Sequence, residues 1–539
     1  MAVSAGVAAG LLLPATYALA GPSPQRTVRV RLAKTGNPDG RSTQPALSAD
    51  GRYVAFTSEA TNLLLREDGN GPVRDVFVLD QGSGALRLVS AAPGGQAANG
   101  SSGQPVLAGD GSVLAFASNA SNLVDADDNR SSDVFVVSRE RGLERASVAA
   151  GGEQADGPSA EPDLSADGRL LVFTSRAGNL VPGDDDEHAD VFVRDLASGA
   201  VALVSATPRR GTTADGDSSA PAISPDGRYV SFSSTAKNLV PGDRNGRPDV
   251  FVRDLATGRT ELVSVARGGG GQNAALARGR AQISDVSRNG RFVVFESDAS
   301  NLVRRDRNRR TDVFVRDRRT RVTRRVSLST TNEEGSGASF LPTITPDGRH
   351  VVFASRADDL VPENSRGLDV FVREVDRETT VLASVGARNR PRGRERAEPK
   401  LERPTISADA DTVAFVSSAS NLVSRDRNRL ADVFLRRMRP AATATASRRV
   451  GLLDGRLLIV FESGDRGAGP LQCRLDDGPP TLCPLGGMLL PRLRDGRHVL
   501  RALAGTPGAH YAPRPIVIRV DVRRGRRPQV RVRNPADDV

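Results

Sequence analysis

Tryptophan is absent from this 539-residue sequence, and tyrosine occurs only four times. Aromatic packing therefore depends on the 17 phenylalanines. Fourteen of them recur at two positions of a repeated unit: Phe56, Phe116, Phe173, Phe232, Phe295, Phe353 and Phe415 at one, and Phe77, Phe135, Phe192, Phe251, Phe314, Phe371 and Phe434 at the other. Almost all aromatic packing thus belongs to the repeat.

Lysine is also scarce, since only Lys34, Lys237 and Lys400 occur and arginine supplies nearly all positive charge. The net charge is +11, from 75 basic and 64 acidic residues, and such a surplus can indicate a nucleic-acid or anionic partner. However, the arginines are scattered through turns beside acids, and no stripe of basic and aromatic residues suited to bases is present. We therefore expect no nucleic-acid binding.

Catalytic motifs are missing as well. The four histidines are His188, His350, His498 and His510, and no G-x-S-x-G motif is present to pair with them. That motif positions the serine of α/β-hydrolases, which would also require a long stretch of alternating strands and helices. The sequence predicts a protein that is not an enzyme.

Only one apolar run has the length to interact with a bilayer, and it lies at residues 1–20. It ends in Ala18-Leu19-Ala20, a typical cleavage pattern of export signals, so Gly21 is the expected mature start. Because no Lys or Arg stands near Met1, a single membrane anchor is the competing interpretation. We predict a signal peptide, no transmembrane segment after its removal, and a secreted or cell-envelope location.

Seven DVF triplets recur at intervals of about sixty residues, which is the signature of a repeat architecture. They begin at Asp75, Asp133, Asp190, Asp249, Asp312, Asp369 and Asp432.

The fourth copy predicts four short strands, at residues 222–224, 229–233, 249–254 and 260–265. Pro225-Asp226-Gly227 supplies one of the turns between them. The second strand is rich in Val and Phe on both faces, as expected for sheets buried between other sheets. Such units bury both faces by stacking radially. We therefore predict an all-β fold with a seven-bladed β-propeller of four-stranded blades over residues 27–437.

The seventh copy lacks a fourth strand, because the Pro- and Ala-rich stretch at residues 440–445 follows its third. The segment Thr27–Arg31 precedes the first copy at the spacing of a fourth strand. We predict that this segment completes the last blade and closes the ring.

The motifs SPDGRYVSF and DVFVRDLATGRTELVSV in the fourth copy resemble the TolB-like, WD-type propeller repeats of bacterial envelope proteins. The resemblance covers about residues 27–437 and implies fold more specifically than activity.

Beyond the repeat, we predict a linker at residues 438–450, a small β-sandwich at 451–522 and a flexible basic tail at 523–539. The run LQCRLDDGPPTLC followed by LRDGRHVLRALAGTPG is similar to bacterial immunoglobulin-like modules. The turn Asp477-Gly478 would bring Cys473 and Cys483 onto facing strands. Because exported chains meet oxidising conditions, a disulfide is favoured over a metal site or free thiols.

The loop between the second and third strands carries a recurrent Asp-x-Asn or Asp-x-Asp pair before the DVF aspartate. Alternating oxygen side chains in a tight loop are what a calcium ion requires. The candidate ligands are Asp127, Asn129, Asp133, Asp184, Asp186, Asp190, Asp243, Asn245, Asp249, Asp306, Asn308 and Asp312.

Two interpretations of these loops stay open. No bidentate Glu follows at the EF-hand position, and Arg244, Arg307 and Arg427 occupy intervening positions, which disfavours a cation. In the alternative, each Asp or Asn caps a turn through the backbone. The connector residues Asp39, Asn99, Asp156 and Asp215 could add outer ligands or simply turn the chain.

We therefore expect an exported, non-enzymatic and monomeric scaffold that binds a protein or an anionic envelope polymer. Eleven arginines at residues 304–325 form either a patch for such a polymer or a solvated rim. The first alternative is a calcium-binding adhesion protein that recognises carbohydrate or protein. The second is a polysaccharide-active enzyme, which would need paired acids on the first strands; residues 222–224 and 343–345 offer none.

Overall fold

The computed structural model describes residues 27–30, 37–64, 69–208, 212–241, 243, 247–265, 284–304, 306–362, 367–386, 402–423, 426–438, 444–453, 456–463, 471–476, 481–483, 488–490, 493–504, 516–522 and 529–533. The chain divides into two compact units, of which one spans Gln25–Arg439 and the other contains Pro440–Val539. The export signal predicted at residues 1–20 lies outside the described residues. In the part that is described, no helix has the length and hydropathy to cross a membrane.

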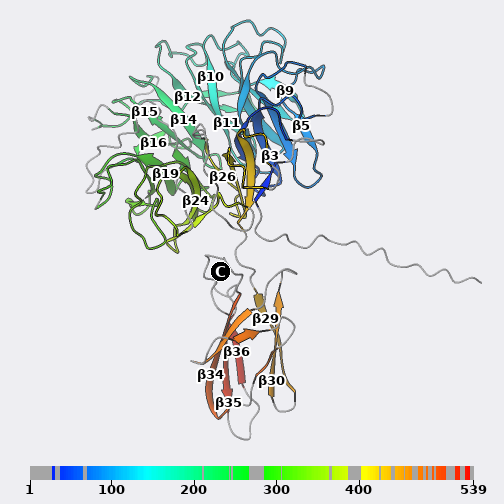
Figure 1. Ribbon diagram of the computed structural model, residues 1–539. Coiled ribbons are helices and arrows are strands. Elements are labelled where there is room, and N and C mark those ends of the chain that lie inside the picture. Colours follow the sequence, from blue (N-terminus) through cyan, green and yellow to red (C-terminus); the bar gives the residue numbers. More distant parts are fainter. Residues whose placement is uncertain are drawn as a thin grey trace, which may run out of the picture. The chain divides into compact units, whose positions relative to one another are not determined.

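The unit Gln25–Arg439 consists of seven antiparallel sheets of four strands each, as predicted (Figure 1). The first three blades are β2 (Ser42–Leu47), β3 (Tyr53–Ser58), β4 (Asp75–Asp80) and β5 (Leu86–Leu88); β6 (Ser102–Leu107), β7 (Val113–Ser118), β8 (Asp133–Ser138) and β9 (Gly142–Arg145); and β10 (Ser159–Leu164), β11 (Leu170–Ser175), β12 (Asp190–Asp195) and β13 (Val201–Leu203).

The next three blades repeat this order. They are β14 (Ser218–Ile223), β15 (Tyr229–Ser234), β16 (Asp249–Asp254) and β17 (Arg259–Leu262); β18 (Ser284–Val286), β19 (Phe292–Ser297), β20 (Asp312–Asp317) and β21 (Val322–Arg325); and β22 (Ser339–Ile344), β23 (His350–Ser355), β24 (Asp369–Glu374) and β25 (Thr379–Leu382). The seventh blade contains β26 (Thr405–Ile406), β27 (Thr412–Ser417) and β28 (Asp432–Arg437), and its fourth strand is β1 (Thr27–Arg29).

The first strands of neighbouring blades contact one another in a closed circle, from β2 through β6, β10, β14, β18 and β22 to β26 and back to β2. These strands therefore surround the axis of a seven-bladed β-propeller, and the predicted fold is confirmed.

The predicted ring closure is also confirmed. Val28 is the Cα partner of Leu435 and Arg29 that of Phe434, and the Val30 N–H donates to the Val433 carbonyl at 3.0 Å. The N-terminal segment is thus hydrogen-bonded to the last repeat.

Stacked phenylalanines from the second and third strands form the centre of each blade. Phe232 and Phe251, for example, are Cα partners whose ring centroids lie 5.8 Å apart, and the seven equivalent pairs fall between 5.7 and 5.9 Å. Apolar clusters then join adjacent blades, as where Val172 and Val191 of blade three pack with Phe232 of blade four. Both faces of each inner sheet are therefore buried, which explains the Val- and Phe-rich second strands.

The strand limits of the fourth copy differ from the prediction mainly at its inner edge. The first strand is Ser218–Ile223 rather than residues 222–224, because a β-bulge between Ser219 and Ala222 extends the pairing past Pro221. Ala220 in this bulge has φ 52°. Gly227 has φ 74°, which the predicted turn requires.

The unit that contains Pro440–Val539 has two antiparallel sheets. One consists of β29 (Ala444–Leu453), β30 (Arg456–Ser463) and β33 (Met488–Leu489). The other consists of β32 (Thr481–Cys483), β31 (Leu471–Leu475), β34 (Gly496–Ala504), β35 (Ile516–Val522) and β36 (Gln529–Arg533).

Strands lie beyond two of the boundaries predicted for this unit. The linker predicted at 438–450 contains the start of β29, because its small residues pair with β30. The tail predicted as flexible contains β36, since the alternating sequence QVRVR pairs with β35. Cys473 and Cys483 lie on neighbouring strands, where their Cα partners are Thr481 and Leu471. The disulfide and the immunoglobulin-like character remain predictions.

Candidate functional site

The aspartate that opens the third strand of each blade is enclosed, with at most 1% of its surface exposed in all seven blades. In six blades, a serine after the fourth strand donates its hydroxyl to this carboxylate and accepts the N–H of the valine that follows the aspartate. The pairs are Ser90–Asp75, Ser147–Asp133, Ser205–Asp190, Ser264–Asp249, Ser327–Asp312 and Ser384–Asp369. The hydroxyl thus replaces part of the water that the carboxylate loses on folding.

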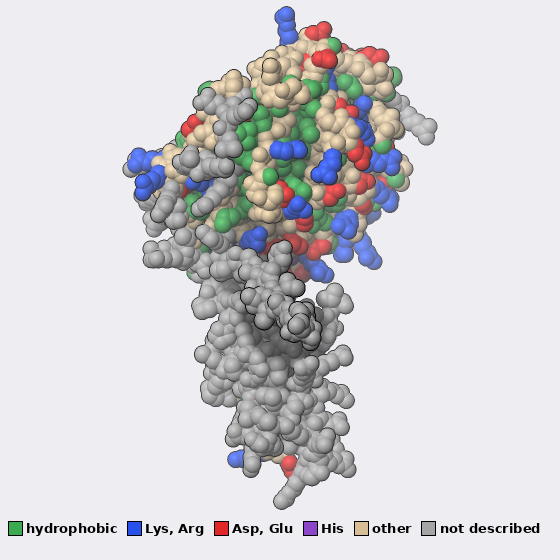
Figure 2. Space-filling view, turned by 90° about the vertical axis from the view of Figure 1, so that its right-hand side faces the viewer, with side chains coloured by type: hydrophobic (Ala, Val, Ile, Leu, Met, Phe, Trp, Pro, Cys, Tyr) green, Lys and Arg blue, Asp and Glu red, His purple; other side chains and the backbone are tan. Residues whose placement is uncertain are grey.

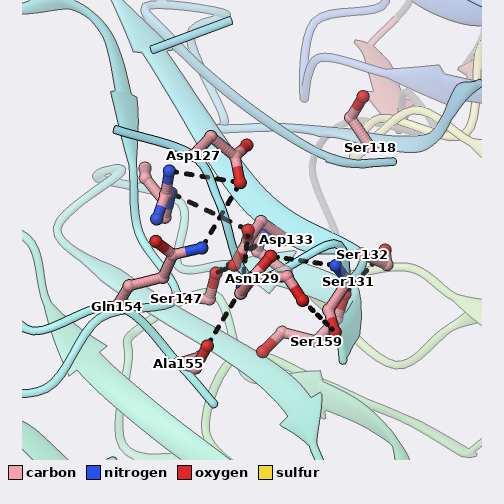
Figure 3. A network of polar contacts seen from close by, with 12 residues as sticks. Ser118, Asp127, Asn129, Ser131, Ser132, Asp133, Ser147, Gln154, Ala155 and Ser159 are labelled. Carbon is pink, nitrogen blue, oxygen red and sulfur yellow. Dashed lines mark hydrogen bonds and ion pairs between the residues drawn. The ribbon is translucent and has the colours of Figure 1, made fainter. Parts of the chain in front are cut away.

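The second oxygen of this aspartate has a different partner, which comes from the loop before the third strand. Asn129 donates from Nδ2 to Asp133 Oδ2 at 3.1 Å and to the Ala155 carbonyl at 3.0 Å, and its Oδ1 accepts the Ser131 N–H at 2.9 Å (Figure 3). Asn308 and Asn428 make the same three contacts in blades five and seven. In blade one, Asn70 also donates to the aspartate and to a backbone carbonyl. This geometry matches the turn-capping interpretation of the loops.

Three blades add an arginine from the fourth strand, buried in blade five and half-buried in blades two and seven, which the sequence alone did not predict. Arg145 lies 3.4 Å from Asp127 and 3.8 Å from Asp133. Arg325 lies 3.1 Å from Asp306 and 3.5 Å from Asp312. Arg29 likewise lies 3.4 Å from Asp426 and 3.2 Å from Asp432. A guanidinium thus contacts both carboxylates of the loop in blades two, five and seven.

These arginines occupy one equivalent position, since each is the Cα partner of the DVF phenylalanine of its blade. Leucine occupies this position in the other four blades, as Leu88, Leu203, Leu262 and Leu382. The repeat therefore exists in an arginine form and a leucine form.

Blade three has the leucine form and one additional acid. Asp186 replaces the asparagine of the other loops, and carboxylate oxygens of Asp184, Asp186 and Asp190 all lie within 4.8 Å of one another. Asp190 Oδ1 accepts the Ser205 hydroxyl, whereas Asp190 Oδ2 is buried without a hydrogen-bond partner among the described residues. Burial raises the pKa of Asp190 to about 7 and that of Asp184 to about 6, and the neighbouring carboxylates add to both shifts.

The remaining predicted ligands are described only in part. Asp243 and Asp249 of blade four are buried, but Asn245 lies outside the described residues. In blade five, carboxylate oxygens of Asp306, Asp312 and Glu334 lie within 4.8 Å of one another. Arg325 contacts all three of these acids. Whether any of these loops binds calcium remains a prediction.

The connector residues turn the chain. Asp156 Oδ1 accepts the Gly178 N–H at 3.0 Å, and Asp215 Oδ1 accepts the Lys237 N–H at 2.7 Å. Asp39 and Asn99 make the same contact with the loop after the second strand of their blades. Each thus fixes the connector between blades to the loop beside it.

Acids on the inner strands were missed by the sequence analysis, which expected none there. Glu161 and Asp163 lie on β10 and Asp285 lies on β18, while Glu296 lies on the adjacent β19. The bulge hid Glu161, because the strand that carries it begins earlier than predicted. Asp163 and Asp285 instead lie at the place of Ala222, inside the range predicted for a first strand, and were overlooked. Glu161 stands at the same place in its strand as Gln44 and Gln104 in theirs, and this correspondence would have revealed it.

These inner acids bridge neighbouring blades. Glu161 accepts the Ala220 N–H at 2.8 Å, Asp163 accepts the Ile223 N–H at 2.8 Å, and Glu296 accepts the Leu341 N–H at 2.7 Å. Burial raises the pKa of Asp163 to about 7 and that of Glu296 to about 7. Arg403, 3.5 Å from Asp285, supplies positive charge near this group.

The exposed arginines that the structure describes in blade five do not form one patch. Arg307, Arg309 and Arg310 are exposed in the loop before β20, whereas Arg319 and Arg321 are exposed at the turn after it, at the opposite end of that strand. The separation of these arginines between the two ends of β20 favours the solvated-rim interpretation. On another side of the propeller, where β5 and β9 lie in Figure 1, Figure 2 also shows basic and acidic side chains interspersed.

Comparison with known proteins places the propeller near TolB. No protein-family model matches the chain. The Tol-Pal system protein TolB of Francisella tularensis subsp. tularensis (strain WY96-3418) is 23% identical over 265 residues, which are 49% of this chain and 47% of TolB. The match thus spans about half the length of that relative. The resemblance to TolB-like propellers is confirmed by this match.

Two solved structures are similar to this chain at low sequence identity. TolB from Acinetobacter baumannii is 13% identical, with 74% of this chain and 79% of that chain covered and a TM-score of 0.35. Oligogalacturonate lyase from Vibrio parahaemolyticus is 11% identical, with 77% and 93% covered and a TM-score of 0.46.

Proposed function

We propose that this chain is an exported, non-enzymatic β-propeller that binds a protein partner in the cell envelope or outside the cell. The similarity to TolB supports a protein-binding role. The apolar run at residues 1–20 supports export.

The observation that carries this proposal is the use of the buried acids to hold the scaffold together. Six of the DVF aspartates accept a serine hydroxyl, and Glu161, Asp163 and Glu296 accept backbone N–H groups of the next blade. A general acid or base must instead reach a proton of the substrate. Because these acids serve the fold, recognition falls to the exposed loops that differ between blades.

A protein is favoured over an anionic polymer as the partner. An extended polyanion would need a continuous basic surface, whereas the exposed arginines of blade five lie at both ends of β20. Arg318 is moreover paired with Glu261 of the preceding blade at 3.0 Å. Short, chemically different loops at one end of a ring are better suited to a folded protein surface.

Fractionation and affinity capture test this proposal. The tagged chain is expected in the extracytoplasmic fraction, and cross-linking before capture is expected to recover the same protein in repeated experiments. Two charge-reversed variants, R307E/R309E/R310E and R319E/R321E, test the two ends of blade five, and we expect both to keep the partner because these arginines form a solvated rim. A cytoplasmic location, capture of polysaccharide instead of protein, or turnover of a polysaccharide would contradict the proposal.

A further inference from the structure

The equivalent positions of the repeat carry different charges in different blades. In blade two, Asp127 and Asp133 share Arg145, which leaves one negative charge when both acids are ionised. In blade seven, Asp426 and Asp432 share Arg29 in the same way. Blade three has three carboxylates, and Leu203 stands in place of the arginine. When all three acids are ionised, the loop therefore carries three uncompensated negative charges. A divalent cation would reduce this negative charge to one, as in blades two and seven.

The hydrogen bonds of blade three leave an acceptor without a donor. Asp190 is 0% exposed and its Oδ2 has no partner among the described residues, whereas Asp133 Oδ2 accepts the amide of Asn129. Asp186 stands in place of that asparagine, and its carboxylate side chain has no N–H to donate. Its own oxygens accept the Thr213 hydroxyl at 2.6 Å and the His188 N–H at 2.8 Å, so its carboxylate is held in a fixed orientation.

The donor set also restricts the class of cation. All three side chains are carboxylates, and hard oxygen donors select Ca²⁺, Mg²⁺ or Mn²⁺ over Zn²⁺ or Cu²⁺. Calcium accepts six to eight oxygens in flexible geometry, whereas Mg²⁺ requires a nearly ideal octahedron. Because the blade and its loop fix the carboxylates, they suit calcium, whose coordination geometry is less strict.

We propose that blade three binds one calcium ion between Asp184, Asp186 and Asp190, and that Arg145, Arg325 and Arg29 occupy the equivalent position as built-in cations in blades two, five and seven. The proposal rests on the geometry of the repeat and is independent of the proposed scaffold function. It narrows the calcium prediction to blade three, where an unpaired buried oxygen, an added acid and a missing arginine coincide, a combination that no other blade shows among the residues that the structure describes.

Calorimetric titration of the metal-free chain with CaCl₂ tests the proposal, with MgCl₂ as comparison. The variant D186N/L203R converts blade three to the pattern of blade two, and D185N removes an exposed neighbouring charge as a matched control. The wild type and D185N are expected to bind one equivalent of Ca²⁺ that D186N/L203R does not bind. In EDTA, D186N/L203R is expected to have a Tm at least as high as the wild type, so that misfolding does not explain the lost binding. Absence of saturable binding by the wild type, or unchanged stoichiometry in D186N/L203R, would overturn the site.

The reciprocal variant N129D/R145L tests the equivalence of arginine and cation. It gives blade two the residues of blade three, and we expect one additional equivalent of bound Ca²⁺ and a rise in Tm with Ca²⁺ concentration. If its stoichiometry equals that of the wild type, arginine and cation do not share a position. A proton held between Asp186 and Asp190 is the competing explanation, and it predicts no metal-dependent rise in Tm for the wild type.

Discussion

Arg325 Nη2 lies 3.1 Å from Asp306 Oδ2, and both side chains are at most 5% exposed. The same guanidinium lies 3.5 Å from Asp312 and also contacts Glu334. Three acids therefore depend on one cation in blade five. Removing one partner of a buried ion pair costs far more than the pair contributes, because the other charge stays buried.

Replacing Arg325 with leucine, the residue of four other blades at this position, should destabilise the propeller. We expect R325L to lower the free energy of unfolding by about 3 kcal/mol, measured by urea denaturation. The neighbouring, exposed Arg324 provides the control, and R324L should change the value by less than about 0.5 kcal/mol. Equal stability of R325L and the wild type would show that the acids of blade five do not need the arginine.

The inner acids should make stability depend on pH. Burial raises the pKa of Glu296 to about 7 in the folded chain, so the folded state binds a proton more tightly than the unfolded state does. The contribution of Glu296 to stability is therefore highest below its unfolded pKa and is lost as pH rises through about 7.

The variant E296Q tests this dependence, because the glutamine oxygen can still accept the Leu341 N–H. We expect the wild type and E296Q to be similar near pH 5, and the wild type to be less stable by on the order of 2 kcal/mol at pH 8. Urea denaturation across this range gives the difference. Parallel stability profiles of the two proteins would exclude a raised pKa.

Ring closure gives the third prediction. A chain that starts at residue 32 lacks β1, so it cannot pair with β28 or place Arg29 beside Asp426 and Asp432. We expect its urea midpoint to fall well below that of a chain that starts at residue 25, which retains β1 and serves as the control. If the two midpoints coincide, β1 does not contribute to the stability of the ring.

The cysteines give the fourth prediction. β31 and β32 are antiparallel neighbours that carry Cys473 and Cys483, and we expect a disulfide in the exported protein. Peptide mapping without reducing agent should recover the two cysteines in one linked fragment. The double variant C473S/C483S should lower the stability of its unit by about 2–4 kcal/mol, and recovery of two free thiols from the exported protein would refute the bond.

The sequence was sufficient to predict the ring because each blade repeats the same phenylalanines, glycine turns and DVF triplet. The alternation of apolar residues and the turn residues predicted the limits of the second and third strands almost to the residue, as at Tyr229–Ser234 and Asp249–Asp254. The inner strands were predicted too short, because Pro221 suggested a strand start where a bulge lets the pairing continue.

The candidate site could be predicted only in part. Spacing identified Asp184, Asp186 and Asp190, but the arginines that distinguish the other blades come from the fourth strand. No local pattern links Arg145 to Asp127. An alignment of the copies does reveal this position. In six blades, the residue two before the serine that contacts the DVF aspartate is Arg or Leu.

The contact between Thr27 and Arg436, which are 409 residues apart, has a consequence for the order of folding. During synthesis β1 emerges first and waits for its partner until the last repeat has emerged. Until β1 pairs with it, the outer edge of β28 has no neighbour, and unpaired edges promote association between chains. Contacts between distant residues also slow folding. The ring therefore closes only after the whole propeller has been synthesised, and the chain has to stay soluble until that step.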